Sequence, residues 1–235
     1  GADGQRIETS GVNTLAAESV GAQWLRQTSG DLIVGAVTAL KPNDVGGTDK
    51  AGLVTTAGNA PINLDVTAGN LTVISNISAN GSGSIDLRTG GTNKAIALNG
   101  ATLSSTSGQV QVLASGDIST STANGTTTEI ATSGNALLVA GGAIGADGQR
   151  IETSGVNTLA AESTGAQWLR QTAGDLIVGA VTALKPLDVG GIDKAGLVTT
   201  AGNAPINLDV MAGSLTVTSN ISANGSGSID LRTGG

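Results

Sequence analysis

The amino-acid sequence predicts an all-β protein: a right-handed parallel β-helix, in which the chain coils into stacked rungs of short strands. Three observations lead to this fold class. Short segments alternate apolar and polar residues with the period of two that strands have. The 37 glycines separate these segments and would weaken any helix. The sequence has two tryptophans and no phenylalanine or tyrosine, so its core must be thin and aliphatic.

The alternating segments share one pattern: apolar residues at every second position, followed by a turn of small residues. In residues 61–73, Ile62, Leu64 and Val66 fall on one face of an extended strand. The same pattern occurs in residues 31–40, 84–91, 109–118 and 135–144. A β-sandwich also has many short strands, but it does not repeat one short phrase at the spacing of a rung. The spacing therefore favours the solenoid.

The chain contains a long tandem repeat. Residues 1–91 align without gaps on residues 145–235, an offset of 144 (145 − 1), and seven pairs differ. We interpret residues 1–144 as one full repeat unit of about six rungs in a continuous solenoid, and residues 145–235 as a second, truncated copy. A recent duplication without present meaning is the alternative. Because both ends fall within the repeat, we expect the chain to be a segment of a longer protein.

The phrases "SGDLIVGAVTAL", "SGQVQVLASGDI" and "GSGSIDLRTGG" resemble the repeats of filamentous haemagglutinin-type proteins. These are large bacterial surface adhesins, many of them exported by two-partner secretion, and the resemblance covers essentially the whole chain. It implies a long extracellular fibre at the cell surface that serves adhesion, cell contact or biofilm scaffolding. The implied partners are copies of the chain itself, head-to-tail or lateral, and a glycan or protein of a host or neighbouring cell.

Charge and composition exclude several other classes. The net charge is −7, and no basic face is visible, so we expect no nucleic-acid partner. No apolar run is long enough for a transmembrane helix. The absence of cysteine excludes disulfides and thiolate metal sites.

The sequence offers little for catalysis, because histidine and cysteine are both absent and the usual nucleophile–base pairs need them. We therefore expect no enzyme and name no catalytic residue. The densest charge cluster, "LKPNDVGGTDK" at residues 40–50, returns at residues 184–194 in the longest gap between rungs. Two carboxylates there could act on a polysaccharide, which is the alternative function. A solvated loop leaving the coil is the simpler interpretation.

Two of the seven differences make the second loop more apolar: Asn43 becomes Leu187, and Thr48 becomes Ile192. Exposed apolar patches often mark contacts, so these four positions are the candidates for lateral contacts between rods. Drift in a tolerant loop is the simpler account.

We expect no cofactor. The only candidate ion is Ca²⁺ at residues 80–91, where Gly81, Gly83 and Asp86 resemble part of the nonapeptide of calcium-binding β-rolls. The order of residues differs from that nonapeptide, and the segment occurs once per unit rather than in tandem.

Trp24 and Trp168 are the only large aromatic surfaces. Alternation in "GAQWLRQT" points Leu25 into the core and Trp24 outward. An outward Trp can stack on a sugar ring or anchor a partner, so both are candidates for a glycan or protein contact in a carbohydrate-binding module. The alternative is a Trp that folds over a corner and shields the core. At about six rungs per unit, the two Trp would recur about 29 Å apart along a straight rod.

Overall fold

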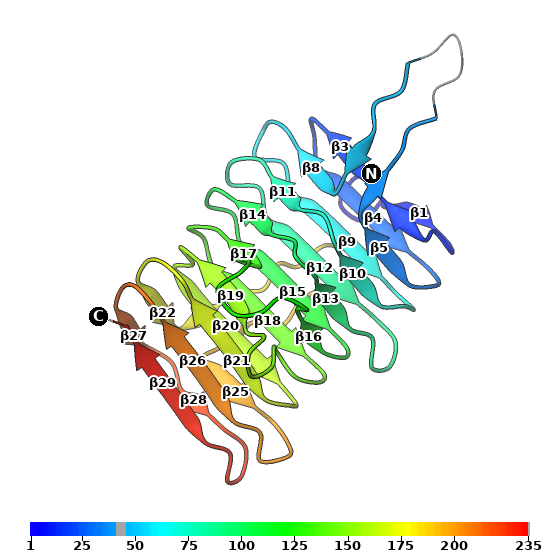
Figure 1. Cartoon of the computed structure of the whole chain (residues 1–235). Helices are drawn as coiled ribbons and strands as arrows, with labels where there is room; N and C mark the ends of the chain where they lie inside the picture. The colour runs from blue at the N-terminus through cyan, green and yellow to red at the C-terminus, as the bar shows by residue number, and fades with distance from the viewer. Residues whose placement is uncertain (41–45, 235) are drawn as a thin grey trace.

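The computed structural model describes residues 1–40 and 46–234 and confirms the predicted fold class. The chain winds as a parallel β-helix, and the short strands of successive coils stack into three long sheets (Figure 1). The two termini lie at opposite ends of this rod.

Within the described residues, a coil that contributes to a sheet supplies one strand, or two in line, and the second sheet, with five strands, covers only part of the rod. In spatial order the first sheet contains β1 (Ile7–Thr9), β4 (Gln23–Gln27), β9 (Ile62–Val66), β12 (Ile85–Thr89), β15 (Val110–Ala114), β18 (Ala136–Ala140), β20 (Thr158–Ser163), β22 (Leu176–Val178) and β27 (Leu215–Val217), with β25 (Leu197–Thr199) and β28 (Ile221–Ser222) beside them. The second contains β2 (Thr14–Leu15), β5 (Leu32–Val34), β10 (Leu71–Val73), β13 (Ile96–Leu98) and β16 (Ile118–Ser119). The third contains β3 (Ala17–Ser19), β8 (Leu53–Thr55), β11 (Ile77–Ala79), β14 (Leu103–Ser105), β17 (Ile130–Ala131), β19 (Ile151–Ser154), β21 (Gln167–Gln171), β26 (Ile206–Val210) and β29 (Ile229–Thr233).

Two small antiparallel hairpins stand outside these sheets. They are β6 (Ala36–Val37) with β7 (Lys50–Ala51), and β23 (Ala180–Val181) with β24 (Lys194–Ala195).

The core is a stack of aliphatic side chains at the positions that alternation predicted. Ile62, Leu64 and Val66 are fully buried. The parallel register places Ile85 directly beside Ile62, and Leu87 beside Leu64, so like side chains form ladders along the axis. Burying one such side chain contributes roughly 1.5–3 kcal/mol. This repetition compensates for the absence of large aromatic residues in the interior.

Glycine permits the tightest corners of the coil. Gly52, which follows the first hairpin, has a φ of 73°, a conformation that side-chain-bearing residues rarely adopt. A Cβ atom at Gly52 would lie 1.9 Å from the carbonyl oxygen of Asn76 on the next coil. The corner therefore admits only glycine.

The repeat in the sequence and the turns of the coil do not match. Strand β1 lies five steps from β18 along the first sheet. Its counterpart in the second copy, β19, follows β18 on the third face. The strands β22 and β25, counterparts of β5 and β8 on the second and third sheets, both lie in the first sheet. One unit therefore spans about five and a half coils, slightly less than the six rungs that the spacing predicted. Counterparts such as β4 and β21 consequently lie in different sheets.

Identical residues also fold differently in the two copies. In the first copy the segment 14–19 forms β2 and β3, which lie in different sheets. In the second copy the same residues form one continuous strand, β20, which pairs with β18 along five residues. Since the sequence is the same, the neighbouring coil decides the local structure.

Candidate interaction surfaces

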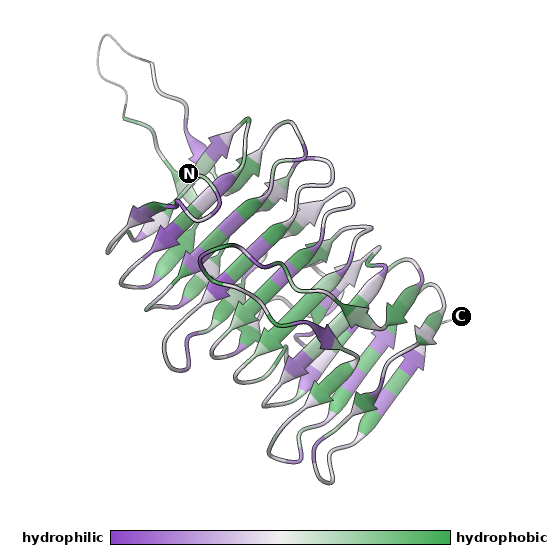
Figure 2. Cartoon of the chain, turned by 180° about the vertical axis from the view of Figure 1, so that it is seen from behind, coloured by the Kyte–Doolittle hydropathy of each residue, from purple (hydrophilic) through white to green (hydrophobic). Residues whose placement is uncertain are grey.

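The loop with the charge cluster leaves the coil, as predicted, and in the second copy it folds back over the outer face of the first sheet. We call residues 180–195 the docked strap. It starts and ends in the hairpin of β23 and β24 and runs along the rod in front of the strands (Figure 2). Its contacts extend from β20 back to residues near the N-terminus.

The base of the docked strap is apolar. Val181 and Ala183 pack against Leu137 and Ala160, which point outward from β18 and β20, in a hydrophobic cluster separate from the main core. The strap thus covers outward apolar side chains of these two strands.

The middle of the docked strap is held through its backbone. The side-chain amide of Gln111 accepts a hydrogen bond from Leu184 N (2.9 Å) and donates one to Leu184 O (3.2 Å). The Arg88 guanidinium donates to Leu184 O (2.9 Å) and to Gly190 O (2.6 Å). These bonds do not depend on strap side chains, so they tolerate the differences between the copies.

At the tip of the docked strap, Asp188 forms ion pairs with two arginines of the first coils. Arg6 donates to both carboxylate oxygens, Nε to Oδ2 at 2.7 Å and Nη2 to Oδ1 at 3.1 Å. Arg26 Nη2 donates to Oδ2 at 2.5 Å. The hydrogen bond from Arg6 holds the pKa of Asp188 below its usual value, despite some desolvation. The carboxylate thus stays ionised, which suits an ion pair better than the donation of a proton.

In the first copy, the described parts of the corresponding segment do not lie on a sheet face. We call residues 36–51 the free strap; its described parts lead away from the coil at the N-terminal end of the rod (Figure 1). Its hairpin base matches that of the docked strap, with Ala39 N donating to Asp49 Oδ1 at 3.0 Å. Val37, however, is 38% exposed, whereas its counterpart Val181 is 1% exposed. Leu40 is 89% exposed.

The candidate positions for lateral contacts face solvent where they are described. Leu187 is 82% exposed and Ile192 is 73% exposed, so neither holds the strap on the sheet. Thr48 is exposed too, and Asn43 lies outside the described residues. A lateral contact through these positions stays a prediction.

Trp24 points outward from β4 while Leu25 is buried, as alternation predicted. Each Trp is half-buried, and an arginine covers its ring: Arg6 Cζ lies 5.7 Å from the centroid of Trp24, and Arg150 Cζ lies 5.3 Å from that of Trp168. The two Trp lie on different faces of the rod, Trp24 in the first sheet and Trp168 in the third, and their spacing along the axis stays a prediction.

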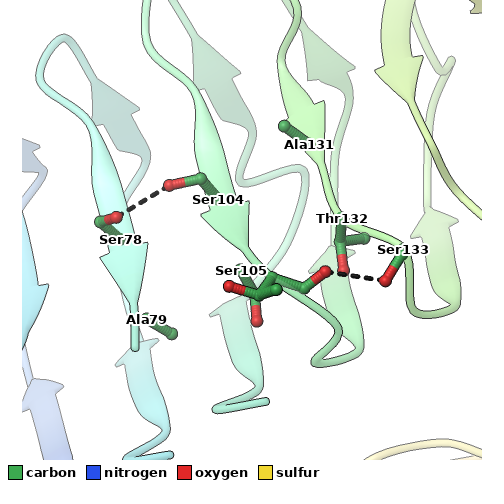
Figure 3. A pocket seen from close by; sticks show the side chains of 8 residues that line it. Ser78, Ala79, Ser104, Ser105, Ala131, Thr132 and Ser133 are labelled. Atoms are coloured by element: carbon green, nitrogen blue, oxygen red, sulfur yellow. Dashed lines mark hydrogen bonds between the residues drawn. The ribbon is translucent and has the colours of Figure 1, made fainter. Parts of the chain in front are cut away.

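A shallow groove of about 430 Å³, which the sequence analysis missed, lies beside the third sheet (Figure 3). Its hydroxyl groups come from successive coils, and Ser78 Oγ lies 2.9 Å from Ser104 Oγ. Ser105 Oγ donates to Gly83 O, and Thr132 Oγ1 donates to Gly108 O, both at 2.8 Å. These hydroxyl groups therefore supply hydrogen bonds to backbone carbonyl oxygens of the turns. The signal in the sequence is the recurrence of Ser or Thr at the length of one coil.

The calcium candidate Asp86 is engaged by other side chains. It is fully buried and accepts hydrogen bonds from Arg88 Nε (2.8 Å) and Gln111 Nε2 (2.9 Å). In the described part of the chain, no three acidic residues gather in a group that could hold a metal ion.

Fold and surfaces together define a class: a β-solenoid of tandem units, each with a strap. No protein-family model, curated protein or solved structure matches the chain. Across residues 1–40 and 46–234, no helix is long and apolar enough to cross a membrane.

Proposed function

We propose that this chain is a segment of a structural and adhesive fibre on a bacterial surface. The observation that carries the proposal is the continuous join between the two copies. Strand β18 of the first copy pairs with β20 of the second along five residues, and one aliphatic core extends from Leu25 to Val210. Units stacked this way lengthen a rod without adding a new kind of interface.

The docked strap adds a second connection across the same join, outside the coil. Through Asp188 it ties the second copy to Arg6 and Arg26 in the first coils of the rod. A rod that is held both through its sheets and along its surface suits a mechanical role, in which it keeps distance and resists unfolding.

The resemblance to filamentous haemagglutinin-type repeats supports the location outside the cell and the adhesive role. The partners of such a fibre are further copies of itself and a glycan or protein on a facing cell.

A carbohydrate-binding module is the second candidate, favoured by the two outward Trp side chains with a guanidinium group over each ring. The arrangement offers one aromatic surface and a donor of hydrogen bonds to a sugar. Replacing both residues, Trp24→Ala and Trp168→Ala, and measuring attachment to cells tests this candidate. Unchanged attachment would exclude it, and it would leave the fibre proposal intact.

Negative-stain electron microscopy of the native, full-length protein tests the fibre. We expect long thin rods, because each unit continues the coil of the unit before it. Compact separate particles would contradict the proposal and would favour a solenoid that serves a local binding or polysaccharide-acting site.

A further inference from the structure

The second copy repeats, on another side of the rod, the residues that hold the strap tip in the first. Arg150 and Arg170 are the counterparts of Arg6 and Arg26, at the same offset of 144 (150 − 6 and 170 − 26). They flank Trp168, whose strand β21 belongs to the third sheet, whereas Trp24 lies in the first.

The surroundings of Arg150 reproduce those of Arg6 in two contacts. Arg150 Nη1 donates to Leu169 O at 3.3 Å, and Arg6 Nη1 donates to Leu25 O at the same distance. Each guanidinium group also lies over the Trp of its own copy.

The surroundings of Arg170 likewise reproduce those of Arg26. Arg170 Nε donates to Asp209 Oδ2 at 3.3 Å, and Arg26 Nε donates to Asp65 Oδ2 at 3.0 Å. In each copy the Nη1 atom pairs with the glutamate on the preceding strand. The two arginines of the second copy thus keep the partners that Arg6 and Arg26 have within the first.

The two sites differ in the strap aspartate. In the first copy Arg6 Nε donates to Asp188. Arg150 Nε is buried and has no hydrogen-bond partner within the described residues, which is a costly state for a charged donor. Burial, together with the charge of Arg170, lowers the pKa of Arg150. The site therefore favours an added carboxylate.

The free strap has the sequence and the hairpin base of a segment that docks in the second copy. Its sequence matches the docked strap except at positions 43 and 48, its hairpin base is the same, and its apolar residue Val37 is uncovered. Among the described residues, one chain thus contains strap segments that cover no sheet and a sheet face that no strap covers.

We propose that the face around Arg150 and Arg170 binds the strap of a further copy of the repeat unit, whose aspartate equivalent to Asp188 enters between the two guanidinium groups. The free strap binds the matching face of a unit on its N-terminal side. Each unit in an array would then clamp its predecessor. This inference rests on the proposed tandem fibre and names the contact that joins its units.

The test extends the whole chain by one unit: residues 92–235 are repeated after Gly235, which adds a third strap. Hydrogen exchange is then followed by mass spectrometry. Peptides of the second and third straps are identical, so a docked third strap gives one slow population. A free third strap gives two populations of equal size, which contradicts the proposal. The free strap, recognised by Asn43 and Thr48, serves as the fast reference, exchanging about tenfold faster or more.

A matched pair of variants checks the site. In the extended chain, Arg150→Gln should release the third strap and Arg6→Gln the second, so each variant should split the shared strap peptides into a slow and a fast population of equal size, whereas the unchanged extended chain gives one slow population. Two Arg variants without effect on their straps would overturn the proposed contact.

A second measurement uses the chain as it is and does not depend on folding of the extension. A synthetic peptide of residues 180–195 is titrated into the Trp24→Phe variant, where Trp168 alone reports. A saturable change in fluorescence that Arg150→Gln weakens about tenfold or more, equivalent to about 1.4 kcal/mol, supports the proposal. No response, or an equal response in the variant, contradicts it. If the native protein forms rods but these two measurements are negative, the fibre proposal stands and only the proposed strap contact is rejected.

Discussion

Glu129 is a carboxyl group that the coil buries completely. Its Oε1 atom accepts hydrogen bonds from the hydroxyl groups of Thr120 (2.9 Å) and Thr122 (2.8 Å), and Oε2 accepts one from Glu152 N (2.9 Å). Burial nevertheless raises the pKa of Glu129, because these bonds offset only part of the lost hydration. The side chain is held in place at the cost of an unfavourable charge.

We predict that Glu129→Gln stabilises the protein at neutral pH. The raised pKa means that the folded state binds the proton more tightly than the unfolded state, so this group's contribution is full below its unfolded pKa and is lost as pH rises. A glutamine can donate to the Thr hydroxyl groups and accept from Glu152 N without that loss. Urea unfolding at pH 7 and at pH 4.5 measures the difference, which should shrink at the lower pH.

The exposed carboxyl of Glu8 provides the control: Glu8→Gln should show no comparable gain at pH 7. A Glu129→Gln protein that is less stable than the original by the same amount at both pH values would contradict the prediction.

Single residues were partly predictable from the sequence. Alternation placed Ile62, Leu64 and Trp24 on the correct sides of their strands, because a strand offers only two faces. The burial of Glu129 was not predictable in this way. Thr120 and Thr122, whose hydroxyl groups donate hydrogen bonds to its carboxylate, belong to a corner outside the regular alternation.

At the scale of elements, the two straps show how one sequence can take two positions. The sequence predicted the loop from the long gap between rungs, but not its docking. Docking depends on Gln111 and Leu137, which belong to earlier coils and are distant from the strap in the sequence. The copies share the strap and differ in what lies beside it.

We predict that Val181→Asp detaches the docked strap, since the carboxylate would be buried against Leu137 and Ala160 without a partner. The free energy of unfolding should fall by about 1–3 kcal/mol, and the amides of residues 180–195 should exchange faster. Chemical denaturation and hydrogen exchange measure the two effects.

The same change in the free strap, Val37→Asp, is the matched control, because Val37 is already uncovered. It should leave the free energy of unfolding within about 0.5 kcal/mol of the original. Equal losses in the two variants would mean that docking of the strap does not contribute to stability.

At the scale of the whole molecule, the rod exposes its core at the last coil. Ile229 and Leu231 of β29 occupy inward positions, yet they are 46% and 39% exposed at the end of the described coils. Their register partner on the preceding strand, Leu208, is buried. An open end with apolar side chains and unpaired strand edges favours end-to-end association.

We predict that Leu231→Lys reduces self-association of this chain by placing a charge on that open end. Thr216→Lys adds the same charge to the same coil at an exposed, outward position and should change association much less. Sedimentation velocity over a range of concentrations compares the variants. Equal association of both variants and the original would show that the open end is not the contact.

The offset between the repeat and the coil turns a repetition in sequence into a screw in space. If every join resembles the one described, each unit advances about five and a half coils, and the same face returns after two units, or about 11 coils. At ~4.8 Å per coil this is about 53 Å. A flat neighbour, such as a cell wall or a parallel rod, would then meet a strap only at every second unit, and successive straps would alternate between opposite sides of the fibre. This alternation follows from a repeat length that is not a whole number of coils.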